Sequence, residues 1–209
     1  MLKADELYQL LHAAYGSPRW WSDDAFTVMF QAVLVQNTAW RSVEKVCARL
    51  GDPLTPEYIG SVTTEELEAL IRPCGFYKAK ARTIKALAAW FGQYHYERQK
   101  IQQMPISKLR EELLSIRGVG AETADVILVY AFYKPSFIID AYTRRFLARL
   151  GYSFLDDVAV RQFFEAALPK DAELYGWYHW LILTHCLSAC KKDPQCHHCP
   201  LKAHCKQGC

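Results

Sequence analysis

The chain has 209 residues, a hydrophobic fraction of 51% and a formal net charge of only +3. This length suits one large domain or two small ones. No stretch reaches the roughly eighteen apolar residues of a membrane span, and the start, MLKADELYQL, carries charges where a secretory signal would be apolar. These features exclude a membrane protein and a small disulfide-stabilised secreted domain, and they predict a cytoplasmic globular protein.

Apolar residues recur at helical spacing along most of the chain, and strand-like alternation is scarce. A stripe that begins at Ile106 predicts a helix ending near Gly118. The other helices expected from this pattern cover residues 25–35, 80–94, 121–132, 142–150, 162–168 and 177–190. We therefore predict an all-α fold.

Local signals mark helix ends in the first half of the chain. Thr55 before Pro56 is typical of an N-cap followed by proline at the first helical position. Thr63 and Glu66 have the spacing of a capping box, and Pro73 is expected to stop that helix.

A tight turn is predicted inside the segment LLSIRGVGAETADVILVYA, residues 113–131, at Gly118, Val119 and Gly120. Two glycines two positions apart allow a backbone too tight for side chains. Such a turn presents amide groups at the start of the next helix, where they attract an anion such as a phosphate. The alternative is a plain helical hairpin with no ligand.

Asp140 follows the apolar residues 137–139 and opens the next predicted helix. Taken alone, an aspartate at this position is best interpreted as an N-cap, which contributes about 1 kcal/mol. A catalytic role needs further support.

Four cysteines near the end, Cys190, Cys196, Cys199 and Cys205, have the spacing C-x5-C-x2-C-x5-C. Short loops between ligands lose little closure entropy, so the pattern predicts a metal site. Sulfur ligands select zinc or an iron–sulfur cluster, and the spacing does not decide between them. The remaining cysteines are Cys47, Cys74 and Cys186, which we expect to be buried, and Cys209, which has no assigned role.

Residues 190–209 carry a net charge of +3, so the other residues sum to zero. Lys191 and Lys192 lie inside the first cysteine loop. A cationic patch beside a metal loop suits a polyanion such as nucleic acid, and the alternative is a solvated basic tail.

Together these features resemble the endonuclease III branch of helix–hairpin–helix DNA glycosylases. The similarity includes LVQNT at residues 34–38, which resembles the early helix of the family, and GFYKAKA at residues 75–81, which resembles its second loop. Within the branch, GVGAETAD and IIDAYTRRF are most similar to endonuclease III-related proteins that include 3-methyladenine glycosylases.

The resemblance implies two helical lobes. Residues 25–135 would form a six-helix barrel, and residues 1–24 with 136–209 would surround a [4Fe-4S] cluster held by the four cysteines, with zinc as the alternative. The first cysteine gap of five residues departs from the six of well-known members. The implied partner is double-stranded DNA with a damaged base flipped between the lobes, and we expect a monomer.

The resemblance also implies roles for single residues. Asp140 matches the catalytic aspartate, and Gln36 matches the glutamine that fills the gap left by the flipped base. Phe76 matches an apolar wedge, and Lys191 and Lys192 would meet phosphate. The alternatives for Gln36 and Phe76 are a hydrogen-bonded core amide and a core aromatic.

Two positions depart from the family pattern. Glu122 occupies the position of the lysine that forms a Schiff base in bifunctional members, and a carboxylate cannot form that imine. Gln31 occupies the position of the general-acid glutamate of the adenine glycosylases. Glu122 is either an acidic residue favoured by the helix dipole or a catalytic residue that lines the base pocket with Gln31. In the pocket it would hydrogen-bond the extruded base or, if protonated, assist its departure.

The sequence therefore predicts a monofunctional DNA N-glycosylase of base-excision repair. The alternatives are a glycosylase with abasic-site lyase activity, through a lysine such as Lys78 or Lys80, a non-catalytic DNA-damage binder, and a zinc-stabilised scaffold.

Overall fold

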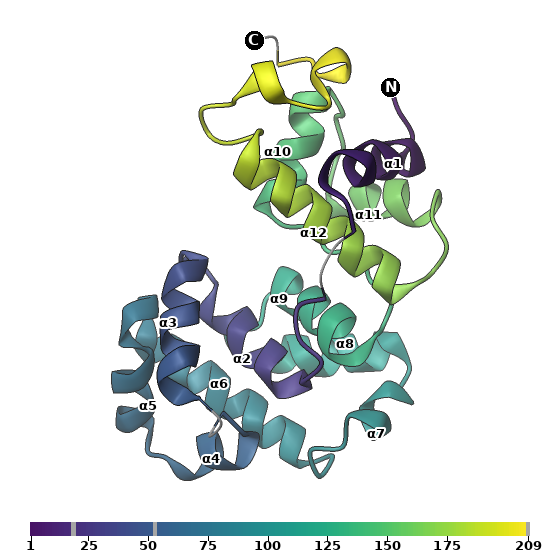
Figure 1. Ribbon diagram of the computed structural model, residues 1–209. Helices are drawn as coiled ribbons and strands as arrows, with labels where there is room; N and C mark the ends of the chain where they lie inside the picture. Colours follow the sequence, from purple (N-terminus) through teal and green to yellow (C-terminus); the bar gives the residue numbers. More distant parts are fainter. Residues whose placement is uncertain (18–19, 52–53, 208–209) are drawn as a thin grey trace. The chain divides into compact units, whose positions relative to one another are not determined.

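A computed structural model describes residues 1–17, 20–51 and 54–207 (Figure 1). These residues contain helices and no strand, which confirms the predicted all-α fold. Contacts divide the chain into two compact units, one of residues 21–134 and one of residues 1–20 with 135–209. Among the described residues, no helix is long and apolar enough to cross a membrane.

The unit of residues 21–134 is organised around α6 (Tyr77–Gly92), which packs against α2, α4 and α5. Most side chains of α2 are buried, and this helix also packs against η2. The other elements of the unit are α2 (Ala25–Leu34), α3 (Trp40–Leu50), α4 (Pro56–Ser61), α5 (Thr64–Ile71), η1 (Arg72–Cys74), α7 (Arg98–Gln102), α8 (Ile106–Ser115), α9 (Ala121–Val126) and η2 (Ile127–Ala131). The start of α6 and the loops before α3 and α9 carry Phe76, Gln36 and the glycine turn, whereas Gln31 lies on α2 and Glu122 on α9.

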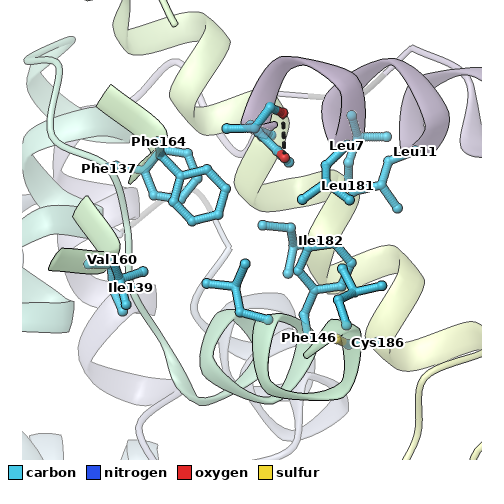
Figure 2. Packing of buried hydrophobic residues seen from close by; sticks show 14 of the residues in the cluster. Leu7, Leu11, Phe137, Ile139, Phe146, Val160, Phe164, Leu181, Ile182 and Cys186 are labelled. Carbon is cyan, nitrogen blue, oxygen red and sulfur yellow. Dashed lines mark hydrogen bonds between the residues drawn. The ribbon is translucent and has the colours of Figure 1, made fainter. Parts of the chain in front are cut away.

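The second unit is built on α12 (Ala172–Ser188), which packs against α1 and α10. Its core is aromatic and aliphatic, and Figure 2 shows the ring of Phe137 lying on that of Phe164, with centroids 3.8 Å apart. The Tyr178 hydroxyl donates a 2.8 Å hydrogen bond to the Ala4 carbonyl, which ties α12 to α1. The remaining elements are α1 (Ala4–Tyr15), α10 (Ala141–Leu150), α11 (Asp157–Glu165), η3 (Cys196–His198) and η4 (Lys202–His204).

Helix boundaries marked by a capping signal are confirmed. The Thr55 side chain accepts from the Tyr58 amide, and Thr63 and Glu66 form the predicted capping box. The helix that Thr63 opens ends at Ile71, and Pro73 lies in the short 3₁₀ turn that follows.

Boundaries predicted from apolar periodicity alone are less accurate. The helix predicted from Gln162 begins at Asp157, and the one predicted from Trp177 begins at Ala172. The first turns of both helices include polar, exposed residues, so the apolar stripe begins one turn late. Each start has an aspartate N-cap instead: Asp156 accepts from the Ala159 amide and Asp171 from the Leu174 amide.

The helix predicted over residues 121–132 is not a uniform α-helix. It is α-helical as far as Val126 and continues as a π-helical turn, η2, over Ile127–Ala131. All five residues of the turn are buried, and it packs against α2. Because the turn is buried on every side, its sequence has no regularly spaced polar residues. The change of helix type therefore could not be predicted from the sequence pattern.

Candidate active site and nucleic-acid interface

A buried lysine on α6 joins two of the loops that carry predicted site residues. The Lys80 ammonium donates to the Leu34 carbonyl at 2.8 Å, to the Thr38 hydroxyl at 2.7 Å and to the Cys74 carbonyl at 2.8 Å. Lys80 is only 3% exposed, and this burial lowers the pKa of its amine. The ammonium therefore fixes the loop that contains Gln36 against the turn that precedes Phe76.

Gln36 connects the first of these loops to the glycine turn. Its Nε2 donates to the Gly118 carbonyl at 3.1 Å and to the Thr123 hydroxyl at 2.9 Å, and the side chain is half-buried. The Gln36 amide group is therefore hydrogen-bonded within the protein, which agrees with one of the two interpretations that the sequence left open. Its hydrogen bonds place it at the turn between α8 and α9.

The glycine turn is held from α6 as well. The Thr83 hydroxyl donates to the Arg117 carbonyl at 3.0 Å. Gly118 has φ +94°, and a Cβ there would lie 2.1 Å from the Thr83 Oγ1, so only glycine fits. Gly120 has an ordinary φ and open space around it, and Val119 is buried between the two glycines.

Phe76 is an exposed aromatic in an unfavourable backbone conformation. The residue is 72% exposed and has φ +46°, directly after Gly75 at φ +63°. A non-glycine residue in the left-handed region is uncommon. A large apolar side chain that stays exposed to water also lacks the free energy that burial would provide. The exposure excludes a core aromatic, the alternative that the sequence left open for this residue.

Gln31 belongs to an aromatic cluster within the same unit. Its Oε1 accepts from the Trp21 indole at 2.5 Å, and its Nε2 lies 3.4 Å from the Cys47 sulfur. The Trp21 ring meets Trp40 and Tyr130 edge-on, with centroids 5.5 Å and 5.3 Å away. Trp40 is 42% exposed, so one wall of this cluster is open to solvent.

Glu122 lies exposed in the first turn of α9, directly after the glycine turn. Its carboxylate is favoured there by the positive end of the helix dipole. Glu122 has no amine, so a nucleophilic amine for an imine would have to come from another residue.

In the other unit, Asp140 is the N-cap of α10, as the sequence predicted. Its Oδ1 accepts from the Thr143 amide at 2.6 Å, and its Oδ2 lies 3.4 Å from the Nε2 of His179. The residue is only 6% exposed. Burial acts to raise the pKa of this carboxyl, but the contacts with His179 and Thr143 outweigh it and hold the pKa below its usual value. Asp140 is therefore an ionised carboxylate in a nearly dry setting at neutral pH.

His179 was not singled out in the sequence, because a lone histidine among apolar residues is usually just a core residue. One feature of the sequence could have indicated a role for His179: it lies inside the apolar run of α12, where a buried imidazole needs a hydrogen-bonding partner.

The four tail cysteines follow the end of α12. Cys190, Cys196, Cys199 and Cys205 line one cavity, and the Arg149 Nη1 lies 3.2 Å from the Cys190 sulfur. Hydrogen bonding from Cys186, with further contributions from His185 and Arg149, lowers the pKa of the Cys190 thiol. The donor set is therefore one that suits an iron–sulfur cluster or zinc.

The sulfurs are not arranged as a closed metal site. Among residues 1–17, 20–51 and 54–207, no group of three or more possible ligands is placed to hold a metal ion. Cys190, Cys199 and Cys205 are free thiols. Cys74 and Cys186 are buried as predicted, Cys47 is only half-buried, and Cys209 lies outside the described residues.

Lys191 and Lys192 are exposed beside this cavity. Arg149 donates to both of their carbonyls, with a distance of 3.0 Å to the Lys192 oxygen. The backbone of the first cysteine loop is therefore fixed to α10, while the two ammonium groups remain available to an anion.

Comparison with known proteins identifies the class to which this fold and these residues belong. The model of the HhH-GPD superfamily of base excision DNA repair proteins matches residues 30–169, and the chain belongs to this family. A curated protein of Methanocaldococcus jannaschii, whose name assigns it provisionally to the DNA repair glycosylases, is 38% identical over 96% of this chain and 94% of its own length. The endonuclease III of Thermotoga maritima is 29% identical over 88% of this chain and 83% of its own.

Solved structures of the same family are similar over most of the chain. A non-covalent endonuclease III–DNA complex superimposes with a TM-score of 0.80 at 29% identity, covering 100% of this chain and 97% of the other. The 3-methyladenine DNA glycosylase of H. pylori, bound to 1,N6-ethenoadenine, gives a TM-score of 0.74 at 28% identity and covers 87% and 96%. The predicted resemblance to endonuclease III-like glycosylases is confirmed.

The geometry around Lys80 predicts a large effect on stability. Lys80→Met keeps the length of the side chain and removes the ammonium, so buried oxygens lose a donor at about 1–3 kcal/mol each. We expect the free energy of unfolding in urea to fall by at least about 2 kcal/mol. Lys78→Met, on the exposed side of the same helix, is the matched control and should change it by less than about 0.5 kcal/mol. Equal effects of the two substitutions would show that the buried contacts contribute nothing.

Proposed function

We propose that this chain is a DNA glycosylase that hydrolyses the N-glycosidic bond of a damaged or mispaired base without cleaving the strand. The observation that carries the proposal is Asp140, a nearly buried carboxylate whose contacts hold it ionised. Membership of the base-excision family supports the reaction class.

The chemistry follows from the charge of Asp140. Breaking an N-glycosidic bond places positive charge on the deoxyribose, and a fixed carboxylate in a water-poor setting stabilises that charge. One oxygen, Oδ1, is held by the Thr143 amide. The carboxylate also orients the attacking water and accepts its proton, as a general base does.

The partner in this proposal is double-stranded DNA. The solved relatives that support it include an endonuclease III–DNA complex. Phe76 has the exposure and the fixed backbone that a wedge between base steps requires. Gln36 lies beside the Gly118 turn. In this proposal it fills the gap left by an extruded base. The turn of Gly118, Val119 and Gly120 and the exposed Lys191 and Lys192 meet phosphates.

The base pocket in this proposal is formed by residues of the same unit as the wedge. Gln31 in its aromatic cluster offers an amide and stacking surface, and Glu122 adds a carboxylate at the start of α9. Aromatic faces stack an extruded base, and polar groups at its edge select it. The class of base that fits is an alkylated purine, another damaged base or a mispaired pyrimidine.

The proposed absence of strand cleavage depends on which amines near these loops could attack the sugar. Glu122 stands where bifunctional relatives carry the Schiff-base lysine. The Lys80 amine donates to three oxygens and is buried, so it is not available as a nucleophile. Of the two lysines named above as alternatives for a lyase, this leaves Lys78, which is exposed on the same helix.

The tail cysteines are proposed as ligands of a [4Fe-4S] cluster. Cys190, Cys199 and Cys205 are free thiols on one cavity, and Cys196 lines the same cavity. Such a cluster, when bound, supplies a rigid centre that crosslinks the tail. In this proposal residues 1–24 with 136–209 form the cluster lobe, and residues 25–135 form the barrel lobe.

Substitution of Asp140 tests the reaction. Asparagine is about as good an N-cap as aspartate, so Asp140→Asn should leave the unfolding midpoint nearly unchanged while the rate of base release falls by about 100-fold or more. Release is measured in single turnover on duplexes that carry alkylated purines, 1,N6-ethenoadenine, or thymine or uracil opposite guanine. Asp156→Asn changes the equivalent cap of α11 and is the control. If Asp140→Asn releases bases at the wild-type rate, Asp140 is only a cap.

Borohydride reduction distinguishes hydrolysis from a lyase mechanism. An imine forms only when an amine attacks the sugar, so the wild-type protein mixed with abasic duplex and borohydride should give no covalent adduct. Glu122→Lys places an amine at the family position and should give one. An adduct with the wild type would assign lyase activity, and Lys78→Met would then show whether Lys78 is the nucleophile.

Iron analysis tests the cluster. The protein purified under anaerobic conditions should be brown and contain iron and inorganic sulfide, and Cys199→Ser should lose most of both. Cys74→Ala, which removes a sulfur in the other unit, is the control and should keep the full content. A colourless protein that contains zinc would contradict this assignment.

A further inference from the structure

We propose that His179 is a positioning residue for the catalytic carboxylate: its imidazole holds Oδ2 of Asp140 while the start of α10 holds Oδ1. This inference rests on the proposed role of Asp140. It adds a second residue, from a different helix, on which the reaction rate depends.

The first reason is the burial of His179. The residue is 4% exposed and lies on α12 among apolar and aromatic neighbours. A buried imidazole without a hydrogen-bonding partner is costly, so its polar contacts determine which way the ring faces. Asp140 makes one of these contacts, with its Oδ2 3.4 Å from the Nε2 of the ring.

The second reason is the geometry of an aspartate side chain. The terminal torsion of aspartate, χ2, is broad, so one hydrogen bond at Oδ1 fixes a point and leaves the carboxylate plane free to turn. The Thr143 amide supplies that bond at 2.6 Å, as it would for any N-cap. A second contact at Oδ2 fixes the plane. An N-cap needs only the first contact, whereas a catalytic group aimed at a sugar needs both.

The third reason is the rigidity of the residue that supplies the second contact. The neighbouring Tyr178 is completely buried and its hydroxyl donates to the Ala4 carbonyl at 2.8 Å. Ile182, one turn along α12, packs in the core shown in Figure 2. The helix therefore presents the imidazole from a fixed position, which is what orientation of a carboxylate requires.

A near-isosteric pair of substitutions tests this role. His179→Met and His179→Gln place unbranched side chains of similar length at the same position, and only glutamine can donate a hydrogen bond. We expect His179→Met to lower kcat for base release by about 10- to 100-fold with KM nearly unchanged. His179→Gln should retain kcat within about three-fold, because its amide replaces the imidazole donor. If His179→Met does not fold, His179→Phe, which fills the ring volume without a donor, takes its place.

Two controls separate this role from a structural one. Tyr152→Phe removes a hydrogen bond elsewhere in the same unit, from the Tyr152 hydroxyl to the Leu2 carbonyl, so the urea midpoint of unfolding should fall while kcat stays at the wild-type value. Binding to a duplex with a tetrahydrofuran abasic-site analogue should have the same Kd for all these variants.

The outcomes distinguish this inference from the proposed function. Equal kcat values for His179→Met and His179→Gln, in a protein whose activity Asp140→Asn abolishes, overturn the positioning role alone. Full activity in Asp140→Asn overturns the catalytic role of Asp140 and this inference with it.

Discussion

The geometry of the predicted DNA-facing loops depends on a single buried ammonium. Lys80 donates to three oxygens that come from the end of α2, from the loop before α3 and from the turn before α6. A buried carbonyl without a donor is costly. A lysine satisfies all three acceptors at once, which no neutral side chain of similar size can do. The desolvation that lowers its pKa is the free-energy cost of this arrangement.

Around this lysine, the segments that carry Gln36, Phe76 and Gly118 behave as one assembly. Gln36 bonds to the glycine turn, and Thr83 holds the same turn from α6. A binding surface made of loops is precise only when another element fixes each loop. Here α6 has that function, with Lys80 and Thr83 placed about one turn apart on one helix.

Asp140 shows how one side chain serves folding and, in the proposed function, chemistry. Its Oδ1 caps α10, and its Oδ2 faces His179. Burial alone would favour the protonated acid, but the two contacts reverse that preference. The contact with His179, together with the Thr143 amide that caps the helix, therefore keeps the group charged where water is scarce.

The sequence was informative where one local rule decides the structure. The cap at Thr55, the capping box at Thr63 and the cap at Asp140 each need only a few neighbouring residues, and all were predicted. The contacts of Lys80 and His179 were not predicted, because they join residues 6 to 46 positions apart. The π-helical turn η2 was missed because its residues are buried on all sides, which leaves no polar pattern in the sequence. The resemblance supplied the family.

The close approach of Gly118 to Thr83 has a consequence for how this sequence can vary. A methyl group at position 118 would overlap the hydroxyl at position 83, two sites 35 residues apart on different elements. A protein with this backbone that carries alanine at the first site must also have given up the threonine, or have shifted the turn away from α6. The two positions are expected to change together, and such a paired change would report that the hairpin sits differently on its supporting helix.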